Sequence, residues 1–134
     1  MSAGKVVVGY VPTPEGEAAL AAAADEARLR GAGLVVVSTT RGDSNVAAEL
    51  PQTSKLAMAV ASIRSGGVET DVRHLEHARD AADSLVAVAE EVGASLVVIG
   101  LKKRSAVGKL LLGSTAQRVL LDAKCSVLAV RSSA

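Results

Sequence analysis

A run of cationic residues precedes a glycine-serine pair in the last third of the chain. The cations are Lys102, Lys103, Arg104 and Lys109, and Gly113-Ser114-Thr115 follows them. This triplet is typical of a helix start, where unpaired backbone N–H groups and the positive end of the helix dipole attract an anion. A solvated charged loop is the alternative interpretation of the cations alone. The adjacent helix start favours a phosphate-binding site.

Catalytic and metal-binding patterns are weak elsewhere in the chain. His74 and His77 lack the cysteine or carboxylate partners that would complete a metal site, so we interpret both as surface residues. Cys125 precedes the last expected strand and is interpreted as a small buried packing residue. No Ser-His-Asp order or carboxylate pair can be assigned. We therefore expect a protein that is not an enzyme, with slow ATPase activity as the open alternative.

The composition bounds the possible partners. The 134 residues suffice for one domain, residues 1–134, and Tyr10 is the single aromatic residue. Single-stranded nucleic acids are bound by base stacking on several aromatic side chains, and this chain has one. A net charge of +1 gives no general attraction to nucleic acid or anionic membranes, and no apolar run approaches the about 20 residues that span a bilayer. We expect neither nucleic-acid nor membrane partners.

The cellular compartment is predicted from two features of the chain. With one cysteine no internal disulfide forms, which suits a reducing compartment. The first residues enter an apolar strand directly and lack the hydrophobic region and cleavage site of a signal peptide. Both features favour a cytoplasmic location.

Short β-branched runs alternate with helical stretches along the chain. Apolar runs predict buried strands of a parallel sheet, and the partly alternating residues 68–75 predict an edge strand. Thr13-Pro14 predicts a capped helix start, and Gly31 and Gly33 its end. The expected strands are Val6–Val11, Leu34–Thr39, residues 68–75, Leu96–Gly100 and Ser126–Arg131, and the expected helices are residues 14–30, 52–64, 80–92 and 114–122.

This alternation predicts an α/β fold, an open five-stranded parallel sheet of Rossmann-like type with helices on both faces. Ligands of such sheets bind beyond the carboxyl ends of the strands, where the strand order reverses. Residues 99–115 leave the carboxyl end of the fourth expected strand, so the cationic segment lies where a ligand is expected. Residues 40–51 are interpreted as a surface crossover, with a mobile lid as the alternative.

The segment Gly100-x-x-Lys103, nine further residues and Gly113-Ser114 resembles the nucleotide signature of the universal stress protein family. That signature has glycine, two residues, glycine, nine residues and Gly-Ser or Gly-Thr. The resemblance extends over nearly the whole chain. Further similar segments are residues 5–8, 94–100, 112–119 and 125–131.

The resemblance implies a stress-associated cytoplasmic protein, usually a homodimer, whose nucleotide-binding members hold ATP at the reversal of strand order. Two groups of residues are carried over to this chain. The phosphate and ribose contacts fall on Gly100, Lys103, Gly113, Ser114 and Thr115, and the base and sugar side on Gly9, Tyr10, Val11 and Thr39.

Two departures from the family pattern bear on the nucleotide. Lys103 replaces the second signature glycine, so either its ammonium binds phosphate or its stem fills the ligand space. Val11 replaces the aspartate that ends the first strand, and a valine coordinates no Mg²⁺. Glu15 and Glu17 are interpreted as helix-start residues. We expect weak binding of ATP or AMP, with a role for magnesium left open.

The last expected strand, Ser126–Arg131, predicts the oligomeric state. An apolar strand at a sheet edge presents unpaired backbone groups, which antiparallel pairing with a second copy satisfies. The resulting hypothesis is a stress-response regulatory or sensing homodimer that weakly binds an adenine nucleotide. The alternative is a nucleotide-independent dimeric interaction module that has lost its ATP site.

Overall fold

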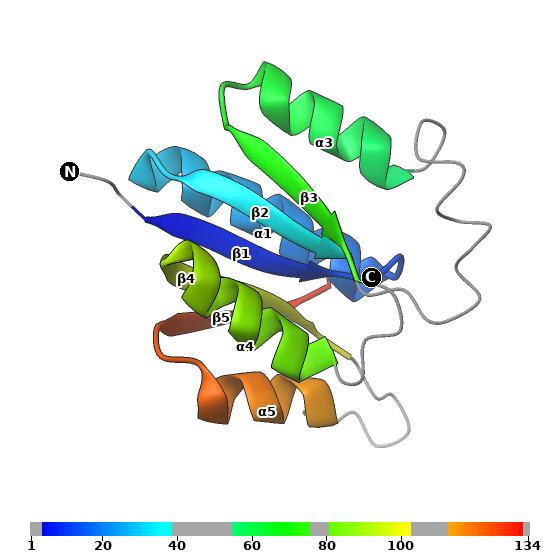
Figure 1. Ribbon diagram of the computed structural model, residues 1–134. Helices are drawn as coiled ribbons and strands as arrows, with labels where there is room; N and C mark the ends of the chain where they lie inside the picture. The colour runs from blue at the N-terminus through cyan, green and yellow to red at the C-terminus, as the bar shows by residue number, and fades with distance from the viewer. Residues whose placement is uncertain (1–3, 39–54, 76–80, 103–112, 133–134) are drawn as a thin grey trace.

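A computed structural model describes residues 4–38, 55–75, 81–102 and 113–132, and the remaining residues are outside the description. The described strands form one parallel sheet in the order β3-β2-β1-β4-β5 (Figure 1). This confirms the predicted α/β fold. The strands are β1 (Lys5–Tyr10), β2 (Gly33–Ser38), β3 (Thr70–His74), β4 (Ala94–Leu101) and β5 (Ser126–Arg131), and the helices are α1 (Pro14–Arg30), α3 (Lys55–Ser65), α4 (Ala81–Val92) and α5 (Ser114–Asp122).

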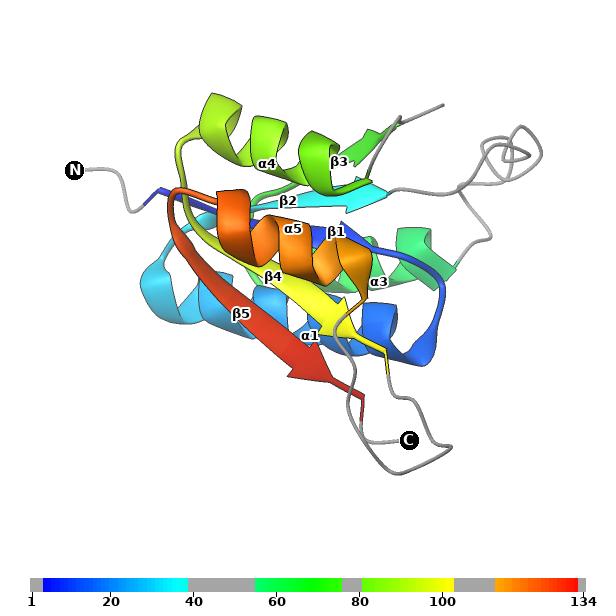
Figure 2. The same cartoon turned by 90° about the horizontal axis from the view of Figure 1, so that it is seen from below.

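Helices cover both faces of the sheet, as the sequence predicts. Figure 2 shows α1 and α3 on one face and α4 and α5 on the other. Alternate residues of β1 divide between the two layers: Val6 and Val8 pack toward α1, and Val7 packs toward α4. All three valines are fully buried, which is why the central strands read as continuous apolar runs.

The local signals at α1 act as predicted. The Thr13 hydroxyl accepts a hydrogen bond from the Gly16 backbone N–H at 3.1 Å, and Pro14 occupies the first turn. Gly31 ends the helix in a left-handed conformation with φ 64°, which glycine adopts without steric cost. These caps fix where the chain leaves β1 and enters β2.

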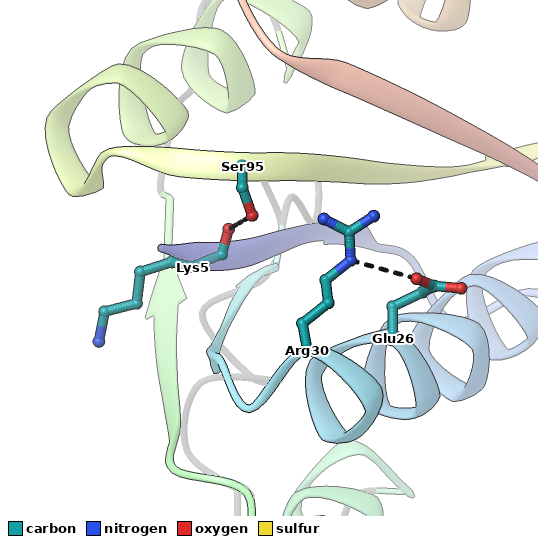
Figure 3. A network of polar contacts seen from close by, with 4 residues as sticks. All are labelled: Lys5, Glu26, Arg30 and Ser95. Atoms are coloured by element: carbon teal, nitrogen blue, oxygen red, sulfur yellow. Dashed lines mark hydrogen bonds and ion pairs between the residues drawn. The ribbon is translucent and has the colours of Figure 1, made fainter. Parts of the chain in front are cut away.

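Two polar contacts lie near the amino-terminal end of the sheet (Figure 3). The Ser95 hydroxyl donates to the backbone carbonyl of Lys5 at 3.5 Å and so joins the start of β4 to the start of β1. Nearby, Arg30 Nε lies 3.3 Å from Glu26 Oε1 on α1. An i,i+4 pair of this kind contributes about 0.3–0.5 kcal/mol.

The strand order reverses between β1 and β4. From β1 the chain enters α1 on one face, and α5 precedes β5 on the opposite face (Figure 2). The helices that follow the neighbouring strands β1 and β4 therefore lie on opposite faces of the sheet. A ligand is expected at this point of such a sheet.

Candidate functional site

The turn between β1 and α1 follows the carboxyl end of β1, where a ligand of such a sheet is expected. The Thr13 backbone N–H donates to the carbonyl of Val11 at 2.8 Å, and this bond folds the chain sharply back over the sheet. A Cβ atom on Gly16 would lie only 1.9 Å from the Val11 carbonyl oxygen. Only glycine therefore fits at this position of the first helical turn.

Val11 lies in this turn, one residue beyond the end of β1. Its side chain offers no oxygen, and its carbonyl already accepts the hydrogen bond from Thr13. The turn thus lacks the carboxylate that would bind a ribose hydroxyl or a divalent cation. Any nucleotide bound here must be held by other groups.

Tyr10 is part of the core between the sheet and α1. Its side chain is 3% exposed, and its hydroxyl donates to Glu17 Oε2 at 2.6 Å. Burial, reinforced by the hydrogen bond and negative charge of Glu17, raises the pKa of the Tyr10 phenol well above its usual range. The side chain therefore fastens α1 to β1, and a ligand contact through the Tyr10 backbone stays a prediction.

The buried Tyr10 phenol predicts a pH dependence of stability. Because its pKa is higher in the folded chain than in the unfolded chain, its contribution is complete below pH about 10 and is lost as the pH rises further. We expect Tyr10→Phe to lower the free energy of unfolding by about 1 kcal/mol at pH 7. The difference between wild type and variant shrinks above pH about 10. Urea unfolding of both proteins from pH 7 to 11 measures it, and a constant difference would contradict the assignment.

Two glycines lie near the carboxyl ends of the central strands. A Cβ on Gly9 would meet Leu85 Cδ1 of α4 at 2.8 Å. A Cβ on Gly100 would meet the Glu15 carbonyl oxygen of α1 at 2.5 Å. Both glycines thus admit a close approach of a helix to the sheet, independently of any ligand. This packing role was not predicted from the sequence.

The start of α5 lies at the same end of the sheet. Gly113 is the residue before the helix, with φ −69° and ψ 167°, and apart from its chain neighbours no described residue lies within 4 Å of the place that a Cβ would take. Gly113 has no side chain that could cap the first turn, and Ser114 and Thr115 are exposed. Backbone N–H groups of an uncapped first turn, together with the helix dipole, favour an anion.

The structure places seven of the nine predicted site residues at the carboxyl end of the sheet, and nothing tests their contacts with a ligand. Gly9 to Val11 lie at the end of β1, Gly100 lies near the end of the adjacent β4, and residues 113–115 start α5. Thr39 and Lys103 are outside the described residues. The exposed Lys102 directly follows β4 and brings a cation to this end.

The remaining candidate residues do not extend this site. His74 ends the edge strand β3 and is exposed, and His77 is outside the described residues. Cys125 packs against the core on the α4 and α5 face as expected, but it is only partly buried, which corrects the expectation of a buried residue. Burial raises the pKa of the Cys125 thiol and so disfavours the nucleophilic thiolate.

The described part of the chain holds no metal cluster and no membrane-spanning helix. Within the described ranges, no three His, Cys, Asp or Glu side chains gather as they would around a metal ion. The helices among these residues are also too short or too polar to cross a bilayer.

The sequence relatives of the chain agree with the resemblance. Residues 3–131 match the profile described as "Universal stress protein family". A protein of Mycolicibacterium smegmatis (strain ATCC 700084 / mc(2)155) named "Universal stress protein" is 39% identical over 126 residues, which cover 94% of this chain and 96% of the relative.

Solved structures extend the similarity. A universal stress protein from Archaeoglobus fulgidus is 35% identical, with a TM-score of 0.76 over 94% of this chain and 97% of its own. A universal stress protein in complex with cAMP is 28% identical, with a TM-score of 0.73 over 99% of this chain and 100% of its own. Another from A. fulgidus, in complex with dAMP, is 28% identical with a TM-score of 0.66 and covers 96% of this chain and 98% of its own.

Proposed function

Because the chain belongs to the universal stress protein family, we propose that it binds an adenine nucleotide at the carboxyl end of its sheet. The nucleotide occupies the space between the ends of β1 and β4 and the start of α5, and the protein acts as a regulatory or sensing homodimer. The observation that carries the proposal is the first turn of α5, which Gly113 leaves without a side-chain cap, beside the reversal of strand order. Two relatives hold dAMP and cAMP, which supports an adenine ligand.

The phosphate is the part of the ligand that this chain is best equipped to hold. The first turn of α5 offers backbone N–H groups to phosphate oxygens, and the hydroxyls of Ser114 and Thr115 are exposed beside them. Lys102 follows β4 at the same end of the sheet, and Lys103 comes next in the sequence. Their ammonium groups act as point charges on the phosphate.

The absence of a carboxylate at Val11 is expected to lower the affinity for a nucleotide and its dependence on a metal ion. Without an oxygen ligand there, the metal and the ribose lose one contact, so we propose weak binding with little dependence on Mg²⁺. The sequence offers no Ser-His-Asp order or carboxylate pair to which catalysis can be assigned. We therefore propose a binding and sensing role rather than hydrolysis.

Lys103 provides the sharpest test of the site. We expect ATP and AMP, each with and without Mg²⁺, to raise the melting temperature of the wild type in a dose-dependent way. Adenosine should raise it less because it lacks phosphate.

Lys103→Ala should raise the Kd measured by calorimetry about tenfold, since a contact with a charged group contributes about 1.5–3 kcal/mol. The control is Lys124→Ala, which removes the same charge before β5, at the opposite end of the sheet.

A second candidate function follows if adenine nucleotides do not bind. Val11 favours an interaction module that keeps the fold and has lost its nucleotide. No stabilisation by any adenine nucleotide at millimolar concentration would support that module. If the Lys103 and Lys124 variants instead bind the nucleotide with equal affinity, nucleotide binding stands and Lys103 makes no contact with the phosphate.

The two edges of the sheet differ in a way that supports a homodimer through β5. At the β3 edge, Leu34 N–H donates to the Glu69 carbonyl, so the next carbonyl, that of Thr70, points away from β2. Arg64 of α3 donates to this carbonyl through Nε at 3.1 Å and Nη2 at 2.7 Å. The edge is thus partly occupied, which disfavours the addition of another strand.

At the other edge, β5 pairs with β4 alone among the described strands. Its four central residues are apolar and half-buried. Antiparallel pairing of β5 with β5 of a second copy satisfies its outward backbone groups and yields a two-fold dimer. We therefore place the dimer interface at Ser126–Arg131.

A further inference from the structure

Two consecutive leucines on α5 are exposed to solvent. Among the described residues, the exposed large hydrophobic side chains are Leu29 at 81%, Met58 at 66%, Leu120 at 42% and Leu121 at 82%. Leu29 and Met58 stand singly on α1 and α3, and single exposed residues need no explanation. The adjacent pair on α5 lies next to the proposed dimer edge.

The contacts of α5 show which way this pair faces. Val119 is fully buried against the sheet, and Arg118 forms an ion pair with Asp83 of α4. Successive helical residues are rotated by about 100°, so Leu120 lies on the side of Val119 opposite to Arg118. Leu120 therefore faces away from α4 and toward the β5 side of the molecule, with Leu121 next to it on the outer surface.

The spacing of strands and helices indicates what covers this side. The following step rests on the β5 dimer of the proposed function. Helix α5 lies over β4 and β5 (Figure 2), so its axis is about one strand spacing, roughly 5 Å, from a two-fold axis beside β5. That axis keeps both copies of α5 on the same face of the joined sheet. The two helix axes are then about 10 Å apart, and packed helices are separated by about 8–10 Å.

The area that a stable dimer buries requires a contact of this kind. A six-residue strand is about 20 Å long, so a strand edge supplies on the order of 200 Å² per chain. Stable interfaces bury about 800 Å² per partner. Strand pairing alone therefore falls short, and α5 offers apolar surface next to the strand.

From this geometry we infer that α5 packs against α5 of a second copy, with Leu120 at the contact and Leu121 at its border. The occupant of the exposed leucine surface is thus a second copy of this chain. The interface has two parts, the paired β5 strands and the paired α5 helices.

A matched pair of variants tests the helix contact. The test protein carries Leu120→Ala and Leu121→Ala, and the control carries Leu29→Ala, whose leucine is as exposed as Leu121. Alanine favours helix, so α5 is expected to form in the variant, which circular dichroism checks. Sedimentation equilibrium of the full chain without nucleotide gives the dimer Kd of each protein. We expect at least a tenfold higher Kd for the double variant and less than a twofold change for the control.

Each contrary result identifies what fails. A dimeric wild type with equal Kd values for the double variant and the control overturns the α5 contact and leaves the β5 dimer standing. A wild type that is monomeric at 100 μM, a concentration chosen to exceed a micromolar Kd, overturns the dimer and with it the α5 contact. Should the double variant misfold, Leu120→Ala alone gives the same comparison, since it still removes the side chain at the contact.

Discussion

Gly16→Ala is expected to lower the free energy of unfolding by about 3 kcal/mol. The added Cβ would lie 1.9 Å from the carbonyl oxygen of Val11 and 2.9 Å from its backbone N, so backbone has to move. That carbonyl already accepts the hydrogen bond that closes the β1–α1 turn. The greater helix propensity of alanine, about 1 kcal/mol, offsets only part of the strain.

Gly113→Ala is the matched control for this prediction. It also adds one methyl group at a helix start, but apart from the chain neighbours no described residue lies within 4 Å of the added Cβ, and φ is −69°. We expect its free energy of unfolding, measured by urea denaturation without nucleotide, to stay within about 0.5 kcal/mol of wild type. Equal midpoints for the two variants would show that the β1–α1 turn does not require glycine.

The fold was predictable because its signals are local and agree with one another. Thr13-Pro14 and Gly31 bound α1 as expected, and Ser114 starts α5. The strand β5 has the predicted bounds, Ser126–Arg131. Other strand ends differ by one or two residues: β1 ends at Tyr10, before Val11. Buried parallel strands read as apolar runs, and a run alone does not mark where hydrogen bonding stops.

The position of the candidate site was predictable from the sequence, but the packing contacts of its residues were not. The end of the sheet follows from topology. The bond from Tyr10 to Glu17 crosses a turn, and the contact of Gly100 with Glu15 joins segments 85 positions apart in the sequence. Contacts of this kind depend on how closely a helix approaches the sheet. No local pattern reports that distance.

Some glycines to which the family resemblance assigns a ligand contact therefore also serve the packing of the helices. Gly9 and Gly100 flank the reversal of strand order, and each is needed by a helix on a different face. Gly113, in contrast, has open space around it among the described residues. The described residues therefore give Gly113 no packing role, and its contact with a ligand stays a prediction.

Gly100→Ala separates these two roles. The added Cβ would lie 2.5 Å from the Glu15 carbonyl oxygen and 2.8 Å from its carbon, so the first turn of α1 must shift away from β4. We expect a loss of about 3 kcal/mol in the free energy of unfolding.

Gly9→Ala is the comparison for this change. Its nearest obstacle is the flexible end of the Leu85 side chain at 2.8 Å, and we expect a loss of about 1 kcal/mol, since a side chain rotates more cheaply than a backbone moves. Urea unfolding of both variants without nucleotide measures the packing role alone. If Gly100→Ala unfolds at the wild-type midpoint and loses only nucleotide affinity, Gly100 serves the ligand and not the helix. If the Gly100→Ala variant is destabilised as expected, Gly100 is required for helix packing. Its presence in the nucleotide signature then says little about binding.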